Sequence, residues 1–131
     1  ADEDETTPLY VAAQYGHAAV VDRLIAARAE VNAADEDETT PLYVAAQNGH
    51  AAVVDRLIAA RADLESKRQT TGSTPLSVAS SNGHAAAVDL LIAARANVDA
   101  KKNSGASALF CATANGHAEV AALLVAAGAT E

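Results

Sequence analysis

The chain has 131 residues, half of them apolar, and a formal net charge of −8 at neutral pH. An acidic surface argues against nucleic acid as a partner, because phosphates attract Lys- and Arg-rich proteins. The longest apolar run, residues 120–127, is too short for a bilayer, which needs roughly 20 residues. The only cysteine, Cys111, cannot form an intramolecular disulfide. We therefore expect no nucleic-acid partner, no membrane partner, and a cytoplasmic or otherwise intracellular protein.

One sequence unit occurs four times along the chain. Residues 1–29 recur at residues 34–62 with a single change, Asn48 in place of Tyr15. A fixed period of 33 or 34 residues is typical of stacked supersecondary units, and not of one globular core. We predict a single domain over residues 1–131, with approximate repeats 1–33, 34–66, 67–100 and 101–131.

Each unit predicts two short helices and an exposed connector. In the second unit Thr40-Pro41 is a typical helix start, because the Thr hydroxyl caps free N–H groups and Pro fits the first turn. Gly49 ends this helix, since glycine adopts the left-handed conformation without steric cost. Apolar residues at helical spacing predict a second helix over about residues 51–60. The polar stretch up to residue 73 is expected to be a loop, and any insertion there leaves the helices in register.

These motifs resemble ankyrin repeats along the whole chain. The family's Thr-Pro-Leu-His-x-Ala motif corresponds to Thr-Pro-Leu-Tyr-Val-Ala at Thr7 and Thr40, and to Thr-Pro-Leu-Ser-Val-Ala at Thr74. The resemblance implies an all-α fold, an α-solenoid of four ankyrin repeats in which antiparallel helix pairs are joined by β-hairpin-like finger loops. It also implies that the chain binds another macromolecule and carries out no catalysis.

The chain departs from the ankyrin pattern at several positions. The glycine that commonly ends the second helix remains only as Gly128 and is otherwise Arg28, Arg61 or Arg95. If these arginines keep a positive φ, each costs on the order of 1 kcal/mol relative to glycine. The finger glycine is replaced by Glu5 and Glu38 in the first two units. The His after Thr-Pro-Leu is replaced by Tyr10, Tyr43, Ser77 and Phe110.

Neither end of the array has the polar outer face that usually closes a solenoid. We interpret the chain as a segment of a longer array or as an engineered sequence, since a 28-of-29 internal match fits natural duplication and deliberate copying equally well. Apolar terminal repeats also make end-to-end self-association an alternative function.

The four Gly-His turns do not predict a catalytic or zinc site. One His per unit places the imidazoles about one repeat apart, too far to share a metal at a ligand distance of roughly 2.0–2.1 Å. By resemblance, each His orders its own turn and bridges neighbouring units. Catalysis needs a unique converging site, which periodic residues do not form. We expect no catalytic residue and no cofactor. The histidines are His17, His50, His84 and His117.

The most specific feature is a run of four carboxylates, residues 35–38, which also occurs at residues 2–5. By resemblance, Asp35 and Asp2 match a structural Asp of the finger. We expect Glu36, Asp37 and Glu38 to contact a basic segment of a protein partner, helped by the charge of −7 on residues 1–62. Such a charge also serves solubility. A weaker alternative is a Ca²⁺ site formed by Asp35, Glu36, Asp37 and Glu38, although they lack the spacing of a dedicated calcium loop.

Differences between the copies mark the remaining candidates. Residues that are the same in all copies are expected to maintain the fold. Residues that differ between copies are explained equally well by partner binding and by neutral drift of the surface. By resemblance the differing positions line the concave groove, with Tyr15 and Tyr43 as exposed aromatic anchors. The expected function is a non-catalytic protein–protein interaction scaffold. Its predicted partner-binding residues are Glu36, Asp37, Glu38, Tyr43, Gln47, Asn48, Tyr15, Ser81, Asn82, Lys101 and Asn103.

Overall fold

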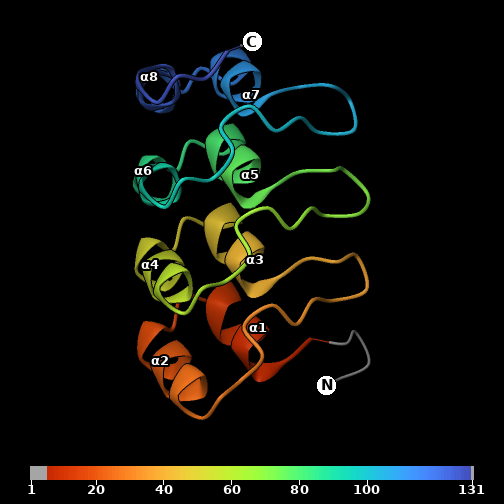
Figure 1. Cartoon of the computed structure of the whole chain (residues 1–131), viewed down its shortest axis with the longest axis vertical. Coiled ribbons are helices and arrows are strands. Elements are labelled where there is room, and N and C mark those ends of the chain that lie inside the picture. Colours follow the sequence, from red (N-terminus) through yellow and green to blue (C-terminus); the bar gives the residue numbers. More distant parts are fainter. Residues whose placement is uncertain (1–5, 131) are drawn as a thin grey trace.

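The computed structural model describes residues 6–130, which form four stacked helix pairs (Figure 1). The first helices of the pairs are α1 (Pro8–Gln14), α3 (Pro41–Gln47), α5 (Pro75–Ser81) and α7 (Ala108–Ala114). The second helices are α2 (Ala18–Ala26), α4 (Ala51–Ala59), α6 (Ala85–Ala93) and α8 (Ala118–Ala126). The predicted all-α solenoid of stacked helix pairs is confirmed.

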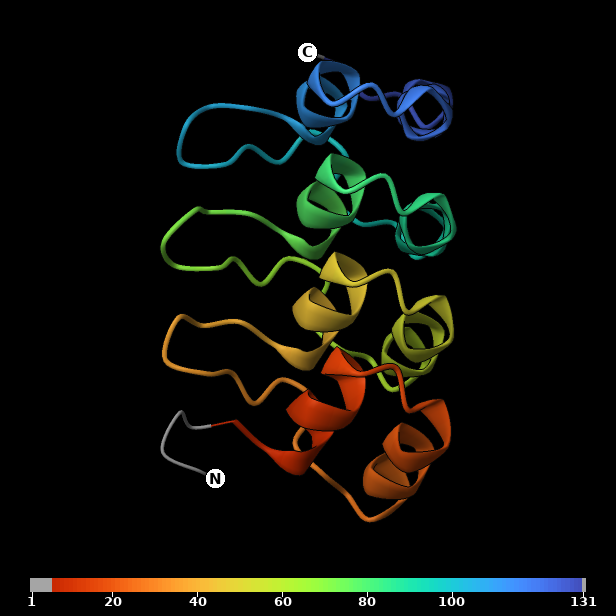
Figure 2. The same cartoon turned by 180° about the vertical axis from the view of Figure 1, so that it is seen from behind.

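The helices form two parallel columns. Each first helix contacts the first helix of the next pair, and each second helix contacts the second helix of the next pair. The connecting loops project sideways from the column of first helices, away from the second helices (Figures 1 and 2). The loops are hairpin-like in path, but within residues 6–130 strand pairing is limited to one isolated antiparallel bridge between Lys101 and Ser107.

A hydroxyl caps the start of every first helix. Thr7, Thr40 and Thr74 each precede a proline and accept a hydrogen bond from the backbone N–H three residues later. The fourth unit has lost the Thr-Pro pair, yet Ser107 Oγ still accepts from Phe110 N at 3.0 Å. The helix starts predicted from Thr-Pro are therefore confirmed, because the cap needs only a short hydroxyl side chain at this position.

An arginine in the left-handed conformation follows the ends of α2, α4 and α6, whereas Gly128 takes this position after α8. Arg28, Arg61 and Arg95 have φ values of 67°, 67° and 72°. The amide that follows each arginine bonds back five residues, as in Ala62 N to Leu57 O at 3.0 Å. This is the closing geometry that helices normally make with glycine. The three arginines therefore keep the positive φ and bear its strain, and Glu38, with a φ of 61°, bears it at the position of the finger glycine.

The core is a thin apolar layer that continues from pair to pair. Leu42, Leu57, Leu76 and Leu91 are fully buried between helices of successive repeats. The loop before α5 is one residue longer than the loops before α3 and α7, and this extra residue does not disturb the layer. The hydrogen bond from Arg68 N to Ser73 O spans five residues, whereas the equivalent bond from Asp35 N to Thr39 O spans four. The insertion therefore lies between these two bonded residues, within the polar stretch where the sequence places it.

Candidate protein-binding groove

An acidic hollow lies between α1 and the loop that leads into α3. Helix α1 supplies Tyr10, Val11 and Gln14, and the flanking residues Thr6 and Tyr15 complete this side. The facing loop, residues 35–38, supplies the carboxylates of Asp35, Glu36 and Asp37. Tyr15 is 63% exposed, so its ring is available for contact. The structure thus brings together three of the residues predicted from the sequence: Tyr15, Glu36 and Asp37.

Asp35 shapes this loop. One carboxylate oxygen accepts from the amides of Asp37 at 2.9 Å and Thr39 at 3.0 Å, which closes the turn. The other oxygen accepts from the hydroxyl of Tyr10 at 3.0 Å, which ties the loop to α1 of the preceding pair. Burial, and then this hydrogen bond to a carboxylate, raise the pKa of Tyr10 to about 12. Asp35 therefore holds the hollow in shape.

The free energy of unfolding should fall as pH rises from 10 to about 12, because Tyr10 loses its proton. The folded state holds this proton more tightly than the unfolded chain, whose Tyr has a pKa of 10.0. The stabilisation is therefore complete below pH 10 and is lost as pH passes through the folded pKa. Tyr10→Phe is the control, since it lacks the titrating hydroxyl. Urea unfolding of both proteins should show their stability difference shrinking over this range; a constant difference would contradict the assignment.

Asp37 connects the acidic loop to the next loop. Its Oδ2 accepts from Arg68 Nε at 2.6 Å and from Thr70 Oγ1 at 2.9 Å, and its backbone carbonyl accepts from Gln69 N at 2.8 Å. The hydrogen bond from Arg68 lowers the pKa of Asp37 below its usual value. Asp37 therefore has partners within the chain. Glu36 and Glu38 are exposed, and within residues 6–130 their carboxylates have no such hydrogen bond or ion pair.

A ladder of amides and imidazoles runs along the ends of the first helices. His50 Nε2 and Asn48 Nδ2 both donate to the carbonyl of Gln14, at 3.0 and 3.1 Å. The next repeat repeats this pattern, with His84 and Asn82 donating to Gln47 O. The last rung consists of the side chains of His117 and Asn115 on Ser81 O. The expected role of the histidines as bridges between units is confirmed for His50, His84 and His117.

The family comparison agrees with this architecture. A model described as ankyrin repeats (3 copies) matches residues 1–68 and 52–130. The chain belongs to the ankyrin repeat family. Ankyrin repeats are in general protein–protein interaction modules and are typically non-catalytic. No curated protein sequence matches the chain.

Tyr43 does not have the exposure that the sequence suggested. The residue is only 2% exposed, and it lies in the same seven-residue helix sequence as Tyr10. In this ankyrin array Tyr43 occupies the position of Tyr10, under the next loop, where its hydroxyl interacts with Arg68. The prediction of Tyr43 as an exposed aromatic anchor is wrong, because the following repeat covers it.

The other predicted residues are distributed along the array. Gln47, Asn48, Ser81 and Asn82 belong to the ladder between ankyrin repeats. Lys101 and Asn103 lie at the far end, on the loop leading into α7, where the amide of Asn103 donates to Thr71 O at 2.9 Å. Lys101 borders a second hollow beside Phe110. The predicted set is therefore not one site, and its convergent part is the acidic hollow.

Three residues of the hollow and its support escaped sequence reasoning. The predicted set contains Tyr43 and Gln47 but not Tyr10 and Gln14, which hold the same positions in the first repeat. Arg68 holds the loop position that Asp35 holds one repeat earlier. This reversal of charge between equivalent loop positions was the available signal for an ion pair between neighbouring loops.

The geometry gives no support to the calcium alternative. Asp35 and Asp37 are occupied by Tyr10, Arg68 and backbone amides. Within residues 6–130 no group of three or more His, Cys, Asp or Glu side chains is arranged to hold a metal ion. The acidic run at residues 2–5 lies outside the described residues. In the same described part of the chain, no helix is both long and apolar enough to cross a bilayer.

Proposed function

We propose that this ankyrin domain binds a protein partner through a Lys- or Arg-rich segment, which docks in the acidic hollow between α1 and residues 35–38. The main observation in support of this proposal is that the exposed Tyr15 and the carboxylate of Glu36 line the same hollow. An aromatic face and a carboxylate both attract a guanidinium or ammonium group. Binding is rigid docking without covalent chemistry.

The charge distribution supports the same choice of partner. Residues 1–62 carry a net charge of −7, and residues 63–131 carry −1. Basic side chains concentrate on the later loops, with Lys67 and Arg68 before α5 and Lys101 and Lys102 before α7. A basic segment is therefore steered toward the first two repeats and away from the last two.

Reversing the exposed carboxylates should weaken binding of basic peptides at least about tenfold, or about 1.4 kcal/mol. The variant Glu36→Lys/Glu38→Lys leaves Asp35 and Asp37 in place, so the loop keeps its internal hydrogen bonds. The probe is a Lys/Arg-rich peptide selected on the wild-type protein from a random displayed library, and affinity is measured by calorimetry.

A matched control separates local contact from total charge. Asp55→Lys/Asp89→Lys makes the same change in net charge on exposed positions of the outer helices α4 and α6. This control should retain most of the affinity at moderate salt, because distant exposed charges are screened beyond a Debye length of roughly 8–10 Å. Equal losses of affinity in the two variants would contradict the proposal that the peptide binds in the acidic hollow.

Tyr15→Asn should reduce affinity for the same peptide several-fold without loss of stability. Asn is the residue that the second repeat has at this position, Asn48, in an otherwise identical sequence. The fold therefore already accommodates Asn at this position. Exposed substitutions of this kind change stability by no more than about 0.5 kcal/mol. Unchanged affinity in calorimetry would show that the ring makes no contact with the peptide.

A further inference from the structure

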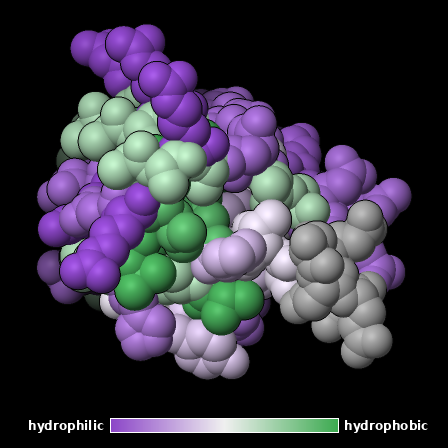
Figure 3. Space-filling model, turned by 90° about the horizontal axis from the view of Figure 1, so that it is seen from below, coloured by the Kyte–Doolittle hydropathy of each residue, from purple (hydrophilic) through white to green (hydrophobic). Residues whose placement is uncertain are grey.

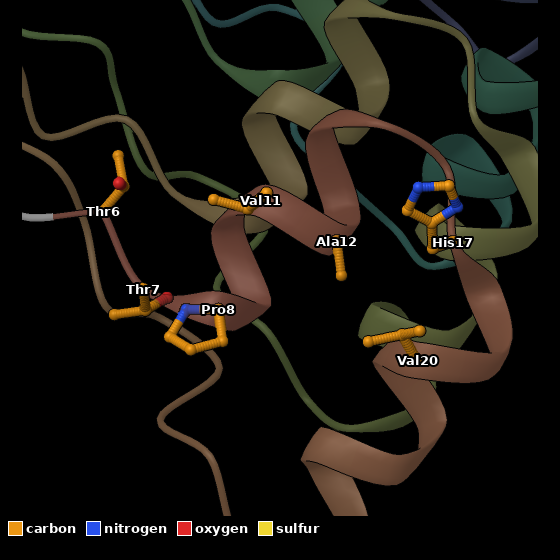
Figure 4. A pocket seen from close by; sticks show the side chains of 7 residues that line it. All are labelled: Thr6, Thr7, Pro8, Val11, Ala12, His17 and Val20. Carbon is orange, nitrogen blue, oxygen red and sulfur yellow. The ribbon is translucent and has the colours of Figure 1, made fainter. Parts of the chain in front are cut away.

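The described array exposes apolar side chains at the end formed by α1 and α2. Val11 is 41% exposed and Val20 is 45% exposed, whereas their counterparts in the second repeat, Val44 and Val53, are 2% and 0% exposed. Figure 3 shows hydrophobic residues gathered in the middle of this end face. The side chains of Val11 and Val20 lie around one hollow between the two helices, with the His17 ring at its edge (Figure 4).

The opposite end of the array, formed by α7 and α8, also exposes large apolar side chains. Phe110 is 55% exposed, while the residues at its position in the first two repeats, Tyr10 and Tyr43, are 9% and 2% exposed. Val125 is 59% exposed, and its counterpart Ile58 is partly buried against the core. The position of Phe110 faces the following repeat, as the bond from Tyr10 to Asp35 shows.

The structure itself shows what covers an end face of this sequence. Helices α3 and α4 have the same sequences as α1 and α2, and their Val44 and Val53 are buried against the preceding helix pair. The fitting occupant of the α1–α2 face is therefore the far side of another ankyrin repeat. Within residues 6–130, the far side of a repeat that no other repeat covers is the face formed by α7 and α8.

The backbone offers a matching hydrogen bond. His50 donates to the carbonyl at the end of α1, and His84 and His117 do the same one repeat further on. His17 makes no such bond within residues 6–130, where no helix pair precedes α1. The equivalent carbonyl at the end of α7 is that of Ala114. Because this acceptor is a backbone atom, the side-chain difference between Gln14 and Ala114 does not remove it.

The packing and the hydrogen bonds between repeats select the relative orientation of two copies. Within the described array each helix pair packs its near face on the far face of the preceding pair, and the His of the near face donates to a backbone carbonyl of that preceding pair. Two near faces placed together would bring two His donors together without this carbonyl. We propose that the α1–α2 face binds the α7–α8 face of a second copy, so that copies continue the solenoid in an open head-to-tail stack.

The test is molar mass against protein concentration, by light scattering and sedimentation velocity. The wild-type average mass should rise continuously past that of a dimer as concentration increases. Val20→Lys blocks the first face and Val125→Lys blocks the second; each variant alone should stay monomeric. Both positions are about half exposed or more, so the fold should be retained, which circular dichroism checks. Val20 is preferred over Val11, because Val11 also lines the acidic hollow.

Mixing the two variants decides the orientation. Each retains one intact face, so the mixture should form a heterodimer of twice the monomer mass and stop there. Ala86→Lys, an exposed change on α6 with the same added charge, should still form the stack. A monomeric wild-type protein up to its solubility limit would overturn the proposal. Dimerisation of either blocked variant alone would also overturn it, because that requires two like faces to pair.

Discussion

A triple variant with Arg28→Gly, Arg61→Gly and Arg95→Gly should be about 3 kcal/mol more stable than the matched triple Ala variant. Each arginine has a φ between 67° and 72°, where a Cβ atom is strained. Glycine removes this strain at about 1 kcal/mol per site, and alanine retains it. The three sites lie in separate repeats, so their contributions should add.

Alanine is the informative control, because both triple variants lose the same three guanidinium groups. Any favourable interaction of those cations with the helix ends disappears equally from both. The difference in unfolding free energy in urea therefore reports the backbone alone. Equal stabilities would contradict the left-handed assignment at the ends of α2, α4 and α6.

Leu57→Ala should lower the free energy of unfolding by about 3 kcal/mol, within the 2–5 kcal/mol range of buried leucines. Leu57 is fully buried in α4, with repeats on both sides. Leu24→Ala is a matched control in α2, which has the same nine-residue sequence. Leu24 is only partly buried at the end of the described array.

The Leu24→Ala variant should therefore lose clearly less stability than Leu57→Ala in urea unfolding. Local sequence is the same in both cases, so the comparison isolates the contribution of a second neighbouring repeat. Equal losses would mean that the interfaces between repeats contribute little, contrary to the stacked core.

The fold was largely predictable because its signals are local. A hydroxyl before proline starts each helix at Thr7, Thr40 and Thr74, and a glycine such as Gly49 ends it, whatever lies elsewhere in the chain. The repetition then predicts stacking, because each helix pair can bury its apolar stripe only against a neighbouring helix pair of the same kind.

Exposure was less predictable, because it depends on position in the stack. Tyr10 and Tyr43 occupy identical motifs, and each is covered by the loop of the following repeat. Phe110, at the same position, is exposed because no described repeat follows it. Comparing the copies within one sequence does not show which copy is covered by a following repeat, and so it does not predict which of these side chains is exposed.

The ion pair between Asp37 and Arg68 shows the same limit for the site. The two residues belong to different repeats and meet only when neighbouring loops align. Sequence reasoning therefore assigned all of Glu36, Asp37 and Glu38 to a partner. In the described part of the chain Asp37 holds the two loops together, while Glu36 and Glu38 are exposed to solvent.

The most direct test of the proposed function is a backbone amide NMR titration of the protein with the selected Lys/Arg-rich peptide. We predict that shift changes concentrate at Gln14, Tyr15 and residues 35–38, and that the amides of α6 and α8 stay unperturbed. Saturable binding whose changes fall on the outer helices, or on the loop before α7, would contradict the assignment of the acidic hollow as the binding site.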